Sequence, residues 1–167
     1  MEGLTLKRCL EFAVATEELG TKVYTNLAKK FSGTKDISDL FSHLAADEQI
    51  HARQFSEYLG KAPAEKGIPE ASENHAYLMA MSMSAFFSNR EGLFLQVEKV
   101  QNRNDALQVA FDFEKATLGF YRAIEDVLGK QEPLGQVIET ERNHVVVLMK
   151  ALLVDGSAFR GLQDMWP

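Results

Sequence analysis

The sequence predicts an all-α fold, a four-helix bundle with one long crossover connection that contains short helices. Apolar residues recur at helical period along four long stretches, and no stretch shows the alternation that is typical of a strand. Short links join the first stretch to the second and the third to the fourth, which makes each pair antiparallel neighbours. The connection between the two pairs, about residues 61–103, is long enough to cross the length of the bundle.

Glycine and proline set the expected helix boundaries. The first helix should end before Gly33 and the second at Gly60, because glycine is common just after the last turn of a helix. Gly129 ends the third long helix in the same way, and Pro133 begins the fourth. Residues 61–72 contain two prolines and are expected to form a loop. The predicted helices span residues 5–31, 35–60, 73–88, 90–100, 104–128 and 133–154.

Composition excludes several classes of protein. The chain has the length and apolar share of one globular domain, so residues 1–167 are expected to form a single domain. A net charge of −6 without a basic tract argues against nucleic acid and anionic membrane surfaces as partners. No apolar run is long enough to span a membrane, and a single cysteine rules out a disulfide framework. The first residues lack an apolar signal core, so a cytoplasmic location is expected.

The chain carries one pattern of polar residues in two copies. In each copy a Glu is followed seven residues later by a Tyr on one long helix, and the next long helix carries Glu-x-x-His. The Glu and Tyr positions recur at an offset of 97 residues, and the Glu-x-x-His segment recurs at an offset of 93. The residues are Glu17, Tyr24, Glu48 and His51 in the first copy and Glu114, Tyr121, Glu141 and His144 in the second.

These spacings place the side chains on shared helix faces. Positions i and i+3 lie about 60° apart around a helix, so the Glu and His of each Glu-x-x-His segment can reach a common ion. Positions i and i+7 differ by about 20°, so each Tyr lies on the face of the preceding Glu. Buried carboxylates are costly unless they are compensated, and carboxylate with imidazole suits divalent first-row metals. We therefore expect the six Glu and His residues to hold two divalent ions, with Tyr24 and Tyr121 just outside them.

Ordinary structural roles are the alternative for each of these residues, because Glu is common on exposed helix faces. The repetition of the whole pattern argues against that alternative. His43 and His75 stand outside the pattern and are expected to be structural or exposed. Glu18 and Asp47 adjoin expected ligands, but one residue rotates a side chain by about 100°, so we expect both in solvent. Cys9 is expected to be a small buried apolar residue.

Four segments resemble the rubrerythrin family within the ferritin-like di-iron carboxylate superfamily: TEELGTKVY, ADEQIHARQF, EKATLGFY and ETERNH. The resemblance implies a ferritin-like bundle that holds two iron ions, for which zinc or manganese are possible substitutes. It also implies roles for the six residues. By resemblance, Glu17 and Glu114 are terminal ligands, Glu48 and Glu141 bridge the two ions, and His51 and His144 each serve one ion.

The resemblance implies redox activity towards hydrogen peroxide or dioxygen, an external electron donor protein, and a homodimer or larger homo-oligomer. Two departures keep other functions open. The sequence has one Cys, so a four-cysteine rubredoxin domain is absent from it, and Thr117 stands where the family has a further Glu. The alternatives are a ferroxidase or other iron-handling protein that acts on ferrous iron, and a metal-binding bundle without turnover.

Overall fold

The computed structural model describes residues 4–62, 67–82 and 90–154 of the chain. This part contains six helices and no strand, which confirms the predicted all-α class. The helices are α1 (Leu6–Lys30), α2 (Lys35–Leu59), α3 (Glu73–Ser82), α5 (Arg90–Lys99), α6 (Arg103–Leu128) and α7 (Leu134–Val154). Residues 83–88 of the helix predicted over 73–88 lie outside the described residues.

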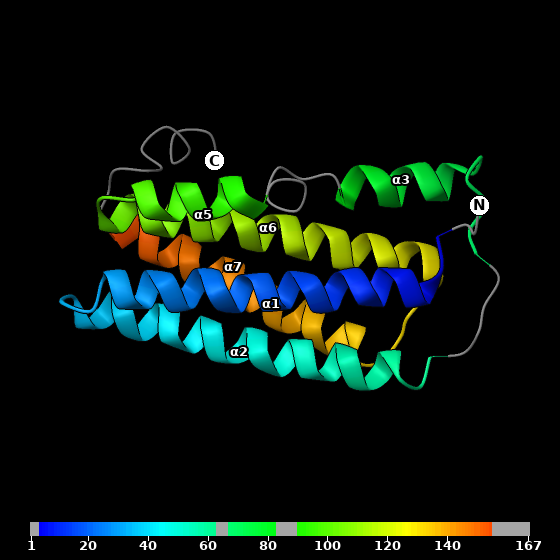
Figure 1. The fold of residues 1–167 in the computed structure, drawn as a ribbon, viewed down its shortest axis with the longest axis horizontal. Coiled ribbons are helices and arrows are strands. Elements are labelled where there is room, and N and C mark those ends of the chain that lie inside the picture. Colours follow the sequence, from blue (N-terminus) through cyan, green and yellow to red (C-terminus); the bar gives the residue numbers. More distant parts are fainter. Residues whose placement is uncertain (1–3, 63–66, 83–89, 155–167) are drawn as a thin grey trace, which may run out of the picture.

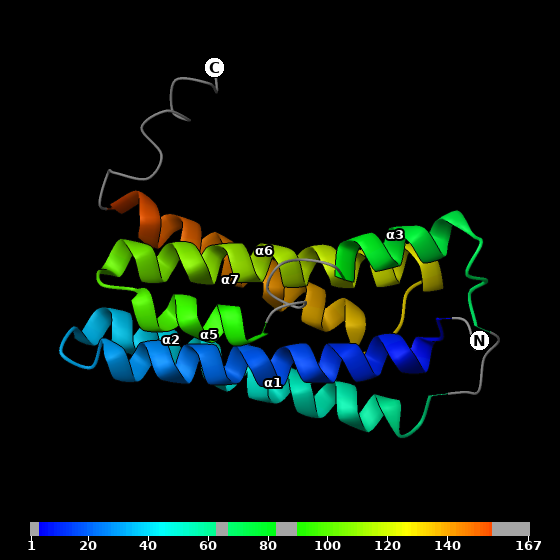
Figure 2. The ribbon, with the colours of Figure 1, turned by 45° about the horizontal axis from the view of Figure 1, so that its top comes forward.

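The four long helices form a bundle of two antiparallel pairs, α1 with α2 and α6 with α7 (Figure 1). In the same view α1 and α6 run in opposite directions along the bundle. The crossover returns the chain along one side, where α3 packs on α6 and α5 lies between α1 and α6 (Figure 2). The predicted crossover is therefore confirmed, and it brings α6 beside α1 so that both copies of the polar pattern face one interior.

Two side chains and one glycine account for three of the helix boundaries. Thr5 caps α1, because its Oγ1 accepts a hydrogen bond from the Arg8 backbone N–H at 3.2 Å. Asn102 caps α6 in the same way, with Oδ1 accepting from the Asp105 backbone N–H at 3.0 Å. Gly129 ends α6 with φ of 80°, a conformation that side chains with a Cβ rarely adopt.

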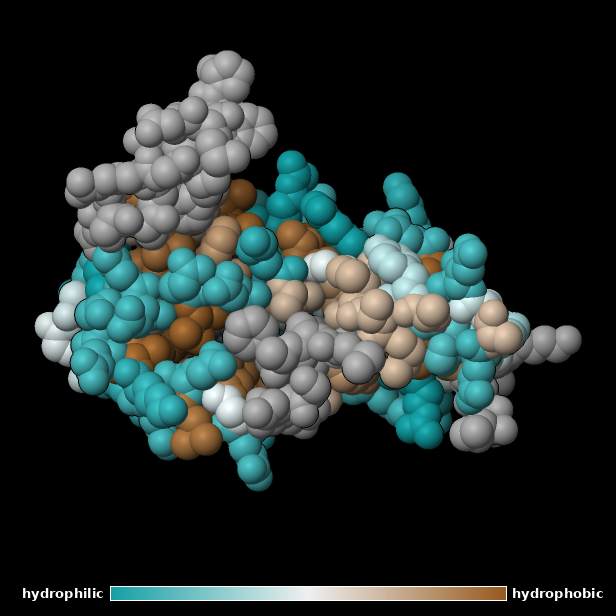
Figure 3. Space-filling view, turned by 90° about the horizontal axis from the view of Figure 1, so that it is seen from above, coloured by the Kyte–Doolittle hydropathy of each residue, from teal (hydrophilic) through white to brown (hydrophobic). Residues whose placement is uncertain are grey.

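One backbone contact ties the start of the crossover to the start of the chain. The Ile68 N–H donates to the Leu4 carbonyl at 2.7 Å, forming an isolated antiparallel bridge. The face that carries α3 and α5 shows hydrophobic and hydrophilic residues side by side (Figure 3), and Tyr77, Met79 and Leu95 are exposed on these two helices. In the part of the chain that the structure describes, no helix is long and apolar enough to cross a membrane.

Aromatic side chains close the bundle interior on both sides of its centre. Towards one end, Tyr24 stacks on Phe41 with ring centroids 6.1 Å apart, and Phe113 meets Tyr24 edge-on at 6.1 Å. Towards the other end, Phe55 packs against Tyr121 with ring centroids 5.2 Å apart. All five rings are buried. The polar residues between these two aromatic layers are therefore shielded from water along the bundle axis.

Candidate metal centre

Each of the four long helices supplies carboxylate or imidazole groups to the middle of the bundle. α1 and α6 each supply one Glu, and α2 and α7 each supply a Glu and a His. None of the six residues is more than 5% exposed. They are Glu17, Glu48, His51, Glu114, Glu141 and His144, the six residues that the sequence pattern singles out.

The six residues form two overlapping groups of potential ligands. Within each group, one ligand atom from every residue lies within 4.8 Å of the others. Glu48 and Glu141 belong to both groups, whereas each remaining Glu and His belongs to one. The groups are Glu17, Glu48, His51 and Glu141, and Glu48, Glu114, Glu141 and His144. This arrangement has the geometry of two adjacent ion positions that share two carboxylates.

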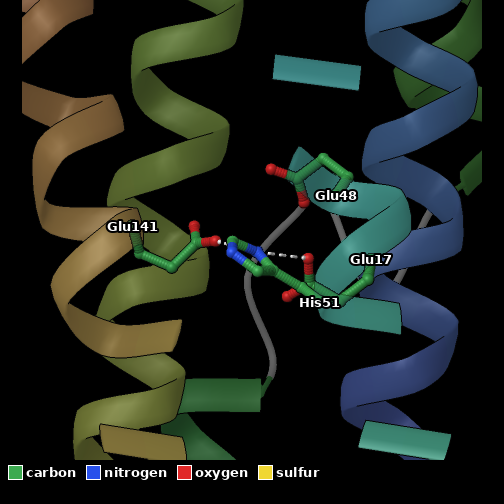
Figure 4. Close-up of side chains that lie close together, drawn as sticks. All are labelled: Glu17, Glu48, His51 and Glu141. Atoms are coloured by element: carbon green, nitrogen blue, oxygen red, sulfur yellow. Dashed lines mark hydrogen bonds and ion pairs between the residues drawn. The ribbon is translucent and has the colours of Figure 1, made fainter. Parts of the chain in front are cut away.

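The ring of His51 lies between carboxylates from two other helices. Its Nδ1 is 3.2 Å from Oε2 of Glu17 on α1 and 2.9 Å from Oε1 of Glu141 on α7 (Figure 4). Glu48, one turn before His51 on α2, points into the same space. The first group is thus built by three helices whose side chains converge on one point.

The ring of His144 has a different environment on each of its two nitrogens. Nδ1 faces the centre, 3.4 Å from Oε2 of Glu114 and 3.5 Å from Oε1 of Glu48. Nε2 faces outward and lies 3.1 Å from Oδ2 of Asp47 on α2. We expected the Asp47 side chain to lie in solvent. It is 44% exposed, but it also contacts His144. The rotation that turns Asp47 away from Glu48 turns it towards α7.

Both tyrosines bond to expected ligands on the opposite helix of the α1–α6 pair. The Tyr24 hydroxyl on α1 donates to Oε1 of Glu114 at 2.5 Å. The Tyr121 hydroxyl on α6 donates to Oε1 of Glu17. The two contacts are related by the repeat, so each phenol holds one oxygen of one carboxylate and leaves the other oxygen for the centre.

Burial shifts the ionisation of the two shared carboxylates. The pKa of Glu48 is raised well above its usual value, first by loss of solvation and then by repulsion from Glu17, Glu141 and Glu114. The pKa of Glu141 is raised well above its usual value for the same reasons, with Glu114 and Glu17 as its strongest like charges. Without cations, the centre therefore favours protonated forms of these two groups.

Neighbouring polar groups shift the pKa values of Glu114 and His144 in the direction opposite to burial. Burial alone would raise the pKa of Glu114, but its contacts with His144, Glu141 and Tyr24 bring it below its usual value. Burial would lower the pKa of His144, but Glu114 and Asp47 raise it above its usual value. Burial and the neighbouring carboxylates raise the pKa of both tyrosines well above its usual value, so both phenols keep their protons.

Five polar atoms of the centre make no hydrogen bond of acceptable geometry, although they are buried. They are Oε1 of Glu48, Oε2 of Glu114, both carboxylate oxygens of Glu141, and Nδ1 of His144. Buried polar atoms without partners are rare in folded proteins, so a cluster of them indicates that an ion or another partner binds there. Carboxylate oxygens and an imidazole nitrogen are ligands for divalent first-row metals, so the donor set fits such ions. Four ionised carboxylates carry a charge of −4, which two divalent cations would balance.

The remaining residues considered in the sequence lie away from the centre. His43 is exposed, with Nδ1 2.7 Å from its own helix's Asp39 carbonyl oxygen, and Glu18 is exposed, as expected. His75 is half-buried. Cys9 is buried, and burial raises the pKa of its thiol to about 11.

Two further residues, Thr117 and Gly20, shape the space around the centre. Thr117 is fully buried, and its hydroxyl donates to the Phe113 carbonyl of its own helix at 3.1 Å. Because threonine has no carboxylate, this position offers none to an ion. At Gly20 of α1, a Cβ would lie 2.8 Å from Oε2 of Glu48. Sequence reasoning missed Gly20, and its signal was a glycine in mid-helix, one turn after Glu17.

The Rubrerythrin family model matches residues 8–85. This match covers α1 from Arg8 onward, all of α2 and all of α3, and so includes the first copy of the repeated pattern. No curated protein and no solved structure matches the chain. The second copy of the pattern is thus supported by the offsets in the sequence and by its place in the same buried centre.

Proposed function

Because the chain is rubrerythrin-like over residues 8–85, we propose that it is a non-haem di-iron protein with redox activity towards hydrogen peroxide or dioxygen. One observation carries the proposal. Two buried ligand groups, each of three carboxylates and one imidazole, overlap in Glu48 and Glu141. Such overlap favours two ions held side by side over one ion or two separate ones.

In this proposal each ion has its own Glu and His and shares the two remaining carboxylates. Glu17 and His51 would hold one ion, Glu114 and His144 would hold the other, and both ions would share Glu48 and Glu141. Bound iron would supply one-electron chemistry between its ferrous and ferric states. The same donors accept zinc or manganese, so the ligand set by itself does not select iron.

The surrounding side chains would control geometry and water around the ions. Tyr24 and Tyr121 hold one oxygen of Glu114 and one of Glu17, which fixes the orientation of both terminal carboxylates. The buried rings of Phe41 and Phe55 close the two ends of the centre. A bulky organic substrate would require the aromatic layers to move apart, which favours a small oxidant.

Electrons for repeated turnover would come from an external donor protein. Residues 1–167 include one Cys, so they cannot form a four-cysteine electron relay of their own. A cytoplasmic location, a homodimer or larger homo-oligomer, and a single domain over residues 1–167 stay predictions. So does the absence of nucleic acid and membrane partners.

A ferroxidase that oxidises ferrous iron for storage or transfer is the second candidate. Thr117 favours it, because the family's additional Glu would offer one ion an extra carboxylate, and threonine cannot. The centre is then more symmetric, with the same number of donors for each ion. A structural bundle filled with zinc is the remaining alternative, and it differs by having no redox cycle.

The test is anaerobic reconstitution with ferrous iron, followed by elemental analysis and by stopped-flow mixing with hydrogen peroxide or dioxygen. We expect about two ions per chain and oxidation by at least one of the two oxidants. Finding one ion or none would overturn the two-ion centre. Two ions that neither oxidant oxidises would overturn the redox function and favour a structural site. In a Thr117→Glu variant, the rate at which peroxide oxidises the bound ferrous iron should rise relative to the rate with dioxygen. An unchanged ratio of the two rates would show that Thr117 does not influence the choice of oxidant.

A further inference from the structure

The contact between Asp47 and His144 is the point where the candidate centre comes nearest to the surface. His144 is the most exposed of the six expected ligands, at 5%, and Asp47 covers it from outside with a side chain that is 44% exposed. Oδ2 of Asp47 lies 3.1 Å from Nε2 of His144, which is hydrogen-bond distance. A carboxylate oxygen accepts, so a hydrogen bond at this distance requires the ring proton to be on Nε2.

That proton determines what the other ring nitrogen can do. A neutral imidazole with its proton on Nε2 has a free lone pair on Nδ1. Nδ1 of His144 is buried, makes no hydrogen bond of acceptable geometry, and faces Glu48 and Glu114. The ring is therefore oriented and protonated so that its free nitrogen points to one ion position.

The repeat predicts no equivalent contact for the other histidine. Asp47 precedes Glu48 by one residue, and at the offset of 93 the matching residue before Glu141 is Thr140. The Thr140 hydroxyl donates to the Gln136 carbonyl of its own helix at 3.2 Å. The two halves of the centre, alike in their ligands, thus differ in what stands behind the histidine.

We propose that Asp47 is a positioning residue for His144, which makes the two ion positions unequal in affinity. This inference rests on the proposed two-ion centre and deepens it. Carboxylates behind metal-binding histidines fix the tautomer and raise the basicity of the ring, and their loss costs about 10–100-fold in metal affinity. The ion served by His144 should therefore depend on Asp47, and the ion served by His51 should not.

The experiment is anaerobic titration of the full chain with cobalt(II), followed by its visible absorption. Wild type should bind two ions. Asp47→Ala should keep one ion at the wild-type affinity and weaken the other by about 10–100-fold. Asp47→Asn, whose amide oxygen can still accept the N–H, should lose less than Asp47→Ala. Thr140→Ala, at the matching position, and Glu18→Ala, an exposed acid beside Glu17, are controls that should leave both affinities unchanged.

The outcomes separate this inference from the proposed function. A wild-type chain that binds no cobalt would overturn both. Two ions bound with equal losses at both positions, or with no loss, would overturn the role of Asp47 alone. If Asp47→Asn and Glu18→Ala both weakened binding as much as Asp47→Ala, negative charge would be the cause and the positioning role would be wrong. Nitrogen-15 spectra of the zinc-loaded chain add a second measurement, because they should show the His144 ring proton on Nε2 in wild type.

Discussion

The hydroxyl of Tyr24 on α1 donates a hydrogen bond of 2.5 Å to Oε1 of Glu114 on α6. Both residues are fully buried. The bond occupies one carboxylate oxygen and leaves Oε2 of Glu114 among the atoms of the centre that have no hydrogen-bond partner. A phenol from one helix therefore sets how the carboxylate of another presents itself to an ion.

Replacing Tyr24 by Phe removes this donor with little change in shape. Oε1 of Glu114 would then be buried without a partner, which costs about 1–3 kcal/mol in the free energy of unfolding. We also expect weaker metal binding, by about 10-fold or more, because the carboxylate loses its fixed orientation. Chemical denaturation of the metal-free chain and a metal titration measure the two effects.

Tyr58→Phe is the matched control. Its hydroxyl donates to Oε1 of Gln131 at 2.6 Å, in a part-buried contact that involves none of the expected ligands. This variant should lose some stability and bind metal as wild type does. Equal metal affinity in the Tyr24 and Tyr58 variants would contradict a role of Tyr24 in holding Glu114.

Replacing a shared carboxylate by Gln should cost the chain more bound metal than replacing an unshared one. Glu48 and Glu141 belong to both ligand groups, so each replacement should weaken both ions. Glu17 and Glu114 belong to one group each, so their replacement should leave about one ion bound. Elemental analysis after dialysis measures the difference, with the exposed Glu18→Gln as control. Equal loss in all four variants would show that no carboxylate is shared.

Much of this arrangement could be predicted from the sequence, because its signals are local or repeated. Glycine and proline mark the ends of the four long helices, whose bounds agree with the prediction within one residue. The six Glu and His residues come together because their spacing fixes their helix faces and the repeat fixes their partners. Whether they bind iron stays a prediction, since ligand types alone do not identify an ion.

Contacts between helices could not be predicted in the same way. The seven-residue spacing puts Tyr24 on the face of Glu17, yet its hydroxyl reaches Glu114, because a long side chain extends beyond its own helix. Asp47 has no acidic counterpart in the second copy, so the repeat gave no sign of its contact with His144. Both contacts depend on how far apart neighbouring helices lie, which spacing along one helix does not determine.

Stability should depend on pH in opposite directions with and without metal. In the metal-free chain the raised pKa values of Glu48 and Glu141 favour folding while these groups are protonated, and this stability is lost as pH rises above their usual range. The raised pKa of His144 has the same effect on stability. Its stabilising contribution is complete below pH 6.5 and is lost as the pH rises above that value. The lowered pKa of Glu114 acts oppositely, but only as the pH falls below 4.5.

The metal-free chain should therefore become less stable between about pH 5 and pH 8. Metal binding requires deprotonated ligands and strengthens over the same range. The difference in melting temperature between metal-loaded and chelated protein should grow with pH, and thermal melts at several pH values measure it. Glu48→Gln removes one of the raised groups, so its metal-free form should show a shallower pH dependence. A difference in melting temperature that stays constant or shrinks with pH would contradict metal binding at these groups.

Metal binding should also depend on the absence of a side chain at Gly20. Glycine inside a helix is about 0.5–1 kcal/mol less favourable than alanine, so Gly→Ala in mid-helix normally stabilises. At Gly20 the added Cβ would lie 2.8 Å from Oε2 of Glu48 and 3.2 Å from its Cδ and Cγ. The carboxylate would have to move, and in the proposed centre it is one of the two that both ions share.

Gly20→Ala should therefore weaken both ions together, by about 10-fold or more, while the helix content of the metal-free chain stays the same. Gly119→Ala is the matched control, since Gly119 also lies inside a long helix. There the new Cβ meets the end of the flexible Met81 side chain, at 3.0 Å from its Cε, and none of the expected ligands. That variant should bind metal normally and melt at the same or a higher temperature. If Gly20→Ala also bound two ions at full affinity, Glu48 would have room to bridge from another position, and the close approach to α1 would be unrelated to metal binding.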